Sequence, residues 1–210
     1  MDKQKKDAKT VDQERMKAFQ EMSSGLRKQG YRQFSMAVGN ERANRFSLTL
    51  AVPVCGLGLV LYMLLSPQAG IGFRSLKDSL MFLVYIILML SAKELIRAVV
   101  WIIFGHIDYK AIEFGIMKDT FAPSVNCLVP IPKKAYMAGN ILAVVLAAIV
   151  PFIIGITCGS FSLMLAAALL IMMSAGDFLL LFALIKHRSS RKDQMICDMP
   201  GQSGCMLFEK

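Results

Sequence analysis

The stretch LMFLVYIILMLSAKELIRAVVWIIF, residues 80–104, decides the fold class of this chain. It is long enough to cross the hydrocarbon core of a bilayer, which takes about 20 residues of α-helix. Inside this apolar run stand Lys93, Glu94 and Arg97. Ionisable side chains are costly in lipid and therefore usually face the interior of a helix bundle. The stretch predicts a transmembrane helix whose charged face packs against other helices.

Three more apolar segments accompany this stretch, and hydrophobic residues make up 55% of the 210-residue chain. A soluble domain of this length rarely contains so many, because its surface must remain polar. The predicted spans are residues 46–65, 80–104, 136–157 and 161–185, which together form a transmembrane domain. We therefore predict an all-α membrane protein, built as a bundle of four transmembrane helices over 46–185.

Basic residues gather at the ends of the predicted spans, and this distribution indicates how the chain is oriented. They include Arg42, Arg45, Lys133, Lys134, Lys186, Arg188, Arg191 and Lys192. Because cytoplasmic loops carry the excess of Lys and Arg, both termini and the 105–135 connection are predicted to be cytoplasmic. The net charge of +9 then reflects topology and attraction to anionic lipids rather than binding to nucleic acid. We expect a cell membrane protein that crosses the bilayer several times and has lipid as its main partner.

Three polar segments flank or connect the predicted spans. Residues 1–45 are basic, and they predict either an amphipathic helix on the membrane surface or a solvated tail. The 105–135 connection partly alternates apolar and polar residues, which favours a short hairpin or an irregular loop. Residues 186–210 are predicted to be a cytoplasmic tail. The apolar residues at helical spacing in the first segment are Met16, Phe19, Met22 and Leu26.

The cysteines favour neither a metal site nor a disulfide framework. They form no C-x-x-C pair, they are odd in number, and two of them lie inside apolar runs. The first apolar run begins near Phe46, so we predict no cleavable signal peptide. The five cysteines are Cys55, Cys127, Cys158, Cys197 and Cys205.

The depths of the charged residues within their spans are similar. From the cytoplasmic ends of the spans, the helical rise places Arg97 about 10 Å deep, Asp177 about 12 Å and Lys93 about 16 Å. Lys93 and Arg97 are four residues apart and therefore share one helix face. We predict a buried charge cluster of Lys93, Glu94, Arg97 and Asp177 that links the second and fourth spans. In the simplest reading it only ties two helices together.

The spacing Lys93-Glu94-Leu95-Ile96-Arg97 is that of an H-E-x-x-H motif in which a cation replaces each histidine. In zinc peptidases that motif puts two ligands on one helix face and a general-base glutamate beside them. With these and other segments, the chain from Gly30 onward resembles the putative zincin peptidases. These are small bacterial membrane proteins similar in design to intramembrane metalloproteases of the site-2-protease type. The other matching segments are 30–31, 104–105, 114–116, 130–136, 174–180 and 197–209.

This resemblance implies a zinc ion held by two helix histidines and by an acidic residue of the last span. The motif glutamate would activate a water molecule. Glu94 matches that general base and Asp177 matches the acidic ligand, but Lys93 and Arg97 occupy both histidine positions. Zinc requires ligands that donate a lone pair, whereas Arg is effectively always protonated and has no acceptor. We therefore expect no metal and no other cofactor here, although zinc is expected for the family.

The two cations also suggest why such a replacement is tolerated. A zinc ion would contribute +2 beside Asp177 and Glu94, and a protonated Lys93 and Arg97 contribute the same charge. Our hypothesis is that these cations stand in for the metal. His106 and His187 are poor substitute ligands, because each lies just past the end of its span and beyond the depth of the cluster.

Three functions from different classes fit this sequence. The favoured one is a non-catalytic pseudoprotease or membrane scaffold of the bacterial inner membrane, which would bind a segment of another membrane protein rather than act as an enzyme. One alternative is an active metalloprotease with unusual ligands. The other is a component of an ion or solute pathway, because intramembrane charges also mark such routes.

Overall fold

The structure is a computed structural model that describes residues 16–37, 39–116, 123–187, 193–199 and 204–210. It holds three helical runs that are long and apolar enough to cross a membrane. A fourth is added when a bent helix pair counts as one span. The runs are α2 (Asn40–Leu65), α3 (Leu76–Gly105), α4 to α5 (Lys133–Thr157), and the pair α6 (Phe161–Met173) and α7 (Ala175–Lys186). Each predicted span falls within one of these runs or within the pair.

Helix α3 begins and ends at clear local signals. The Ser75 side chain accepts a hydrogen bond from the Asp78 backbone N–H, and the Asp78 carboxylate accepts one from the Ser75 N–H. This reciprocal capping box satisfies amide groups that the first turn of a helix leaves without partners. The helix ends at His106, whose φ of 52° lies in the left-handed region that commonly terminates helices. The charged motif therefore sits inside one unbroken helix.

The third run is continuous but locally irregular. Its central turn, Val145–Ile149, is π-helical, and the Val150 N–H bonds to the Val145 carbonyl five residues back. Pro151 follows directly and has no N–H to donate. The run comprises α4 (Lys133–Val144), this π-helical turn and α5 (Val150–Thr157).

The prediction of one continuous helix over 161–185 is wrong at Ser174. The chain leaves helical geometry there, and α6 and α7 meet at a bend of 45°. The Ser174 hydroxyl donates to the Leu170 carbonyl at 2.9 Å, a back-bond that commonly bends helices. A hydropathy profile reports how apolar a run is and how long it is, but it carries no information on backbone geometry. It therefore does not detect such a break.

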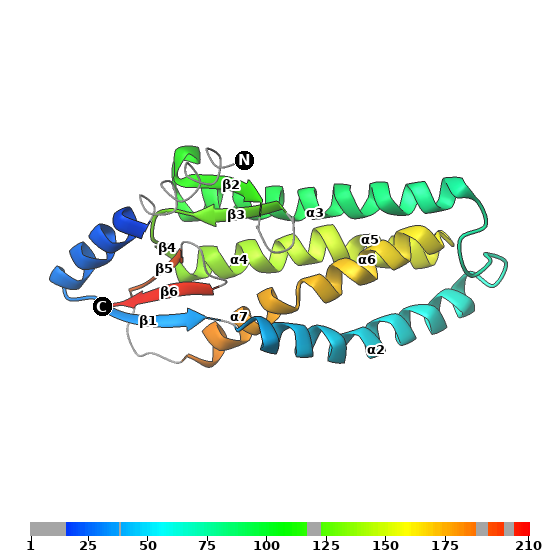
Figure 1. The fold of residues 1–210 in the computed structure, drawn as a ribbon, viewed down its shortest axis with the longest axis horizontal. Helices are drawn as coiled ribbons and strands as arrows, with labels where there is room; N and C mark the ends of the chain where they lie inside the picture. Colours follow the sequence, from blue (N-terminus) through cyan, green and yellow to red (C-terminus); the bar gives the residue numbers. More distant parts are fainter. Residues whose placement is uncertain (1–15, 38, 117–122, 188–192, 200–203) are drawn as a thin grey trace, which may run out of the picture.

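Helix α6 lies among the other apolar helices and packs against α2, α3 and α5. Helices α3 and α2 form opposite edges of the helical part, and α4, α5 and α6 lie between them (Figure 1). Gly155 allows the close approach of α5 and α6, since a Cβ there would lie 2.5 Å from the Met164 backbone nitrogen. Small residues at such contacts are typical of helices that associate within membranes.

The all-α prediction is wrong, because the described chain also contains two antiparallel sheets. The larger sheet has four strands in the order β1-β6-β5-β4 and lies at the end of the helices where α3 ends and α4 begins (Figure 1). It joins the N-terminal segment, the 105–135 connection and the C-terminal tail. Its strands are β1 (Arg32–Ala37), β4 (Ile131–Pro132), β5 (Gln194–Asp198) and β6 (Gly204–Glu209).

The smaller sheet is the hairpin predicted as one alternative for the 105–135 connection. Strand β2 (Ile112–Ile116) pairs antiparallel with β3 (Pro123–Cys127), with Phe114 opposite Val125. A 3₁₀ turn at Tyr109–Ala111 leads into it from α3. The hairpin alternative is confirmed, and β3 packs against α3.

The N-terminal segment contains a described helix over 16–28, followed by β1. This helix lies beyond the four-stranded sheet from the apolar helices (Figure 1). Arg27 Nε donates to the Gln33 side chain at 2.8 Å, so that the helix is tied to β1. Its placement on a membrane surface stays a prediction.

Candidate functional site

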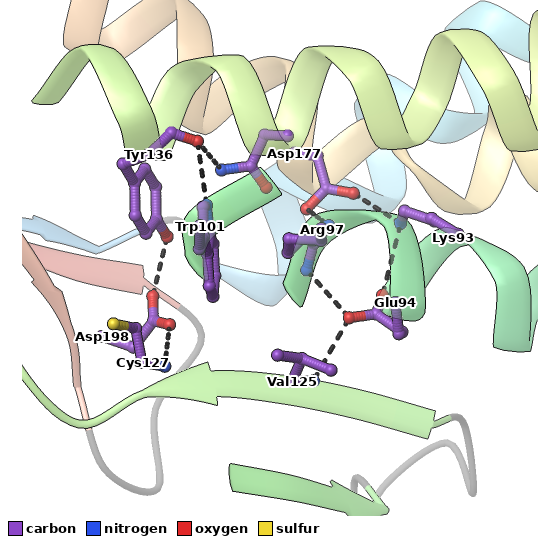
Figure 2. Close-up of polar contacts among 10 residues, drawn as sticks. Lys93, Glu94, Arg97, Trp101, Val125, Cys127, Tyr136, Asp177 and Asp198 are labelled. Atoms are coloured by element: carbon purple, nitrogen blue, oxygen red, sulfur yellow. Dashed lines mark hydrogen bonds and ion pairs between the residues drawn. The ribbon is translucent and has the colours of Figure 1, made fainter. Parts of the chain in front are cut away.

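The four charged residues of the motif and the last span lie together. Lys93 Nζ is 2.5 Å from Asp177 Oδ2 and 4.0 Å from Glu94 Oε1. Arg97 Nη1 is 3.2 Å from Glu94 Oε2, and Arg97 Nη2 is 3.0 Å from Asp177 Oδ1. Figure 2 shows the two cations between the two carboxylates. We call these four residues the charge cluster, and in it each carboxylate contacts both cations.

Local sequence explains this arrangement. Lys93 and Arg97 are one helical turn apart on α3, so both can reach the same neighbour. Asp177 lies in the first turn of α7, directly after the break at Ser174. A carboxylate in the first turn of a helix is favoured by the partial positive charge of the helix N-terminus. Because of the break, Asp177 lies at a helix N-terminus in the middle of an apolar run.

The charge cluster is buried within the protein. The exposed fractions are 7% for Lys93, 8% for Glu94 and 9% for Arg97. The side chain of Asp177 is 19% exposed. Two positive and two negative charges cancel, which is the condition under which buried charges are tolerated. Two donors of the network, Arg97 Nε and Nη2, have no hydrogen-bond partner of good geometry among the described residues, although Nη2 lies 3.0 Å from Asp177 Oδ1.

Glu94 also holds the hairpin. The backbone N–H of Val125 in β3 donates to Glu94 Oε2 at 3.2 Å. Glu94 lies about 16 Å along α3 from Gly105, by the rise of the helix. The hairpin therefore runs back along α3 to the depth of the charge cluster, and the carboxylate at the general-base position serves as an acceptor for backbone and guanidinium donors.

The comparison with known protein families decides which family this chain belongs to. The sequence profile described as putative zincin peptidase matches residues 86–191, just over half of the chain. The chain is a member of the putative zincin peptidase family. Neither the curated proteins nor the solved structures contain a match to it. The matched region contains all four residues of the charge cluster, together with the hairpin and helices α4 to α7.

A further carboxylate, the half-buried Asp198, lies beyond the region that matches the family profile. It accepts hydrogen bonds from the Cys127 N–H at 2.9 Å and from the Tyr136 hydroxyl at 2.7 Å (Figure 2). Burial raises the pKa of Asp198 to about 6, and the two hydrogen bonds oppose that rise. Asp198 is not among the site residues predicted from the sequence. An acid that ends the apolar run Met195-Ile196-Cys197 is a signal that could have identified it.

Two aromatic residues connect Asp198 to the charge cluster. The rings of Trp101 and Tyr136 stack with centroids 5.1 Å apart, and Trp101 Nε1 donates to the Tyr136 carbonyl at 3.3 Å. The Arg97 guanidinium lies 5.9 Å from the centre of the Trp101 ring. Polar and aromatic side chains thus lie one beside the next from α3 through α4 to the tail strand β5 (Figure 2).

The buried thiols near Asp198 have poor reactivity. Burial raises the pKa of Cys127 to about 11 and of Cys205 to about 12, and it raises the pKa of Cys197 further. A thiol must lose its proton to act as a nucleophile or as a metal ligand. These thiols act as small apolar groups of the core, and all five cysteines of the chain are free.

Neither histidine belongs to the charge cluster. His106 follows the end of α3, about 14 Å along the helix axis from Arg97. His187 follows α7, and its Nε2 lies 2.7 Å from Glu209 Oε1. Within the described ranges, no group of three or more His, Cys, Asp or Glu residues is placed to share a metal ion.

Proposed function

We propose that this protein is a non-catalytic member of the putative zincin peptidase family, a membrane scaffold that does not hydrolyse peptide bonds. One observation carries the proposal. At the two positions where the family motif requires histidines, Lys93 and Arg97 form ion pairs with the very carboxylates that match the family's base and ligand.

The donor set of the charge cluster does not fit zinc. A catalytic zinc site takes three protein ligands that donate lone pairs and leaves a fourth position for water. Arg97 has no lone pair to donate, and Lys93 is held as an ion-pair partner of Asp177. Two carboxylates remain, and both already neutralise cations. The cluster reaches charge balance through side chains, so a divalent ion would add uncompensated charge.

The geometry of Glu94 also argues against hydrolysis. A general base needs a free lone pair aimed at the proton that it removes. Glu94 Oε2 accepts from both Arg97 and the Val125 N–H, and Oε1 faces the Lys93 ammonium at 4.0 Å. These contacts hold the carboxylate in a fixed position. The carboxylate works as a structural anchor for the hairpin.

The scaffold is proposed to cross a cell membrane several times with both termini in the cytoplasm. The supporting observation is the set of cations at one end of the apolar helices. Arg42 and Arg45 lie at the start of α2, and Lys186 lies at the end of α7. Lys133 and Lys134 open α4. Cysteine accessibility at added positions near each terminus measures this orientation in intact cells.

The hairpin suggests how a partner segment would bind. The N–H groups of Val125 and Cys127 turn away from β2, and they donate to Glu94 of α3 and to Asp198 of β5. In an antiparallel pair, two directly opposite residues either both point their backbone N–H and C=O groups toward each other or both point them away from each other. Phe114, opposite Val125, therefore turns its backbone groups outward. An extended segment of a membrane protein would add to this outer edge of β2 by strand pairing.

Two measurements test the proposed function. Elemental analysis of the full-length protein purified in detergent should find no stoichiometric zinc, and incubation with a test membrane substrate should show no cleavage. Zinc at one ion per chain that disappears in D177N, with cleavage abolished by E94Q, would instead establish an active peptidase.

The partner is tested separately by a photo-crosslinking residue in native membranes. Placed at Phe114, a residue that is 62% exposed, it should capture a protein neighbour. The matched control is Leu95 on α3, which is 56% exposed on the apolar surface. Equal capture at both positions would remove the support for strand addition while leaving the absence of hydrolysis untouched.

A further inference from the structure

An open hollow lies beside the start of α4, where the third apolar run begins. Its volume is about 460 Å³, and it is lined by Pro132, Lys133, Lys134, Met137 and Gln194. The hollow is therefore located at the boundary between the four-stranded sheet and the apolar helices. A ligand in this position would meet polar and apolar groups together.

The charge of this hollow is not compensated by carboxylates. Lys133 Nζ donates to the backbone carbonyl of His187 at 3.3 Å, and Lys134 is exposed. Within the described part of the chain, neither lysine forms an ion pair with a carboxylate. The nearby Glu209 is already engaged by His187 and by the Gln194 side chain, at 2.7 Å and 3.1 Å. The hollow thus presents two positive charges to whatever enters it.

The apolar side of the hollow continues along α4. Lys134, Met137 and Ile141 recur at the spacing i, i+3, i+7, which places them on one helix face. Lys134 is exposed, Met137 is half-buried and Ile141 is 43% exposed. This face therefore changes from charged to apolar over two turns, in the direction in which the helix runs into the apolar part of the protein.

From this arrangement we infer that the hollow binds the headgroup of an anionic phospholipid, with the phosphate at Lys133 and Lys134 and an acyl chain along Met137 and Ile141. The two lysines favour an anion. The apolar face formed by Met137 and Ile141 favours an anion that carries a hydrocarbon tail. Basic residues at the membrane boundary attract anionic lipids. This inference is independent of whether the protein hydrolyses peptides.

Native mass spectrometry of the full-length protein in a non-ionic detergent tests the inference. The probes are phosphatidylglycerol and phosphatidylcholine, added separately at equal concentration. The wild type should retain phosphatidylglycerol preferentially, and K133Q/K134Q should lower its occupancy at least fivefold while leaving phosphatidylcholine unchanged. K134Q alone should show part of this loss, and it leaves the Lys133 hydrogen bond to His187 intact. Its thermal unfolding should match that of the wild type.

A matched control removes two charges elsewhere. Lys17 and Lys28 are exposed on the helix over 16–28 and do not line the hollow, and K17Q/K28Q should retain phosphatidylglycerol as the wild type does. An equal loss in this control would show only a general effect of net charge and would overturn the inference. Unchanged occupancy in K133Q/K134Q would overturn it as well. Displacement of the lipid by inorganic phosphate alone would assign the hollow to free anions instead.

Discussion

Lys93 Nζ lies 2.5 Å from Asp177 Oδ2, so that a cation of α3 bonds directly to the acidic residue that matches the family's metal ligand. Arg97 contacts the other oxygen of the same carboxylate at 3.0 Å. Asp177 thus has two positively charged neighbours at the place where a metal ion would otherwise bind it. On the function proposed above, this pair of cations takes the place of zinc, and the source of an activated water is lost with the metal.

The stability of the protein should depend strongly on this pair. In D177L two cations would remain with only Glu94 to neutralise them, and breaking a buried ion pair typically costs about 3–5 kcal/mol. K93M/D177L removes one charge of each sign and should be less destabilised than D177L alone. Unfolding in detergent, followed by circular dichroism, measures both effects.

The matched control for this comparison is an ion pair on the surface. Arg45 Nη2 lies 3.3 Å from Glu41 Oε2, and the two side chains are 79% and 88% exposed. Removing Glu41 should change the unfolding midpoint little, because exposed pairs contribute little to stability. If D177L unfolds no more readily than E41Q, the charge cluster does not hold α3 to α7.

Restoring the histidines should restore metal binding. In K93H/R97H two imidazoles would share one face of α3 beside Asp177, which gives three ligands of the types that zinc prefers. We expect about one zinc ion per chain by elemental analysis, and its loss when D177N is added. L95H/V99H places two histidines at the same spacing on the exposed face of α3, turned away from the carboxylates of the cluster, and should stay metal-free. Metal in neither double variant would mean that the cluster no longer has the geometry of the family's site.

Two features of this fold follow from the sequence alone. The apolar runs are visible because a helix that crosses a membrane needs a certain length of apolar residues, and each predicted span lies inside an observed helix or helix pair. The rise per residue predicts that Asp177 lies at a depth between those of Lys93 and Arg97. In the structure the Asp177 carboxylate lies 2.5 Å from Lys93 Nζ and 3.0 Å from Arg97 Nη2. Both inferences use only distances measured along individual helices, which sequence spacing fixes.

The remaining features depend on contacts between distant segments. Strand β6 pairs with β1, although Glu209 and Arg32 lie at opposite ends of the chain, and no local pattern specifies that partner. The bond from Val125 to Glu94 joins a loop strand to the middle of a helix. Asp198 becomes a polar centre only because Cys127 and Tyr136 reach it from two other elements. Such contacts appear only once the chain is folded.

The hold of Glu94 on the hairpin is open to measurement by hydrogen exchange. In E94A the Val125 N–H would lose its acceptor, so peptides that cover β3 should exchange faster than in the wild type. In E94Q the amide oxygen could still accept from Val125, and exchange in β3 should stay closer to the wild type. The strand β6 is the internal reference, because it does not contact Glu94. Equal protection of β3 in E94A and in the wild type would show that the hairpin is held by other contacts.

Asp198 should make the stability of the protein depend on pH. Its pKa of about 6 in the folded protein lies above its ordinary value of 3.8, because burial penalises the charged form. The folded protein therefore binds this proton more tightly than the unfolded chain does. The resulting stabilisation is complete below about pH 4 and is lost as the pH rises through about 6, a change of up to about 3 kcal/mol. The unfolding midpoint should fall over this window.

The variant D198N isolates this contribution from the other titrating groups. Asparagine keeps an oxygen that can accept from Cys127 or Tyr136 but does not titrate, so the fall in midpoint between about pH 4 and 6 should be smaller than in the wild type. The difference between the two curves, recorded in the same detergent and buffers, measures the effect of Asp198 alone. Parallel curves would mean that Asp198 takes up no extra proton on folding, and the carboxylate would then be ionised throughout the range.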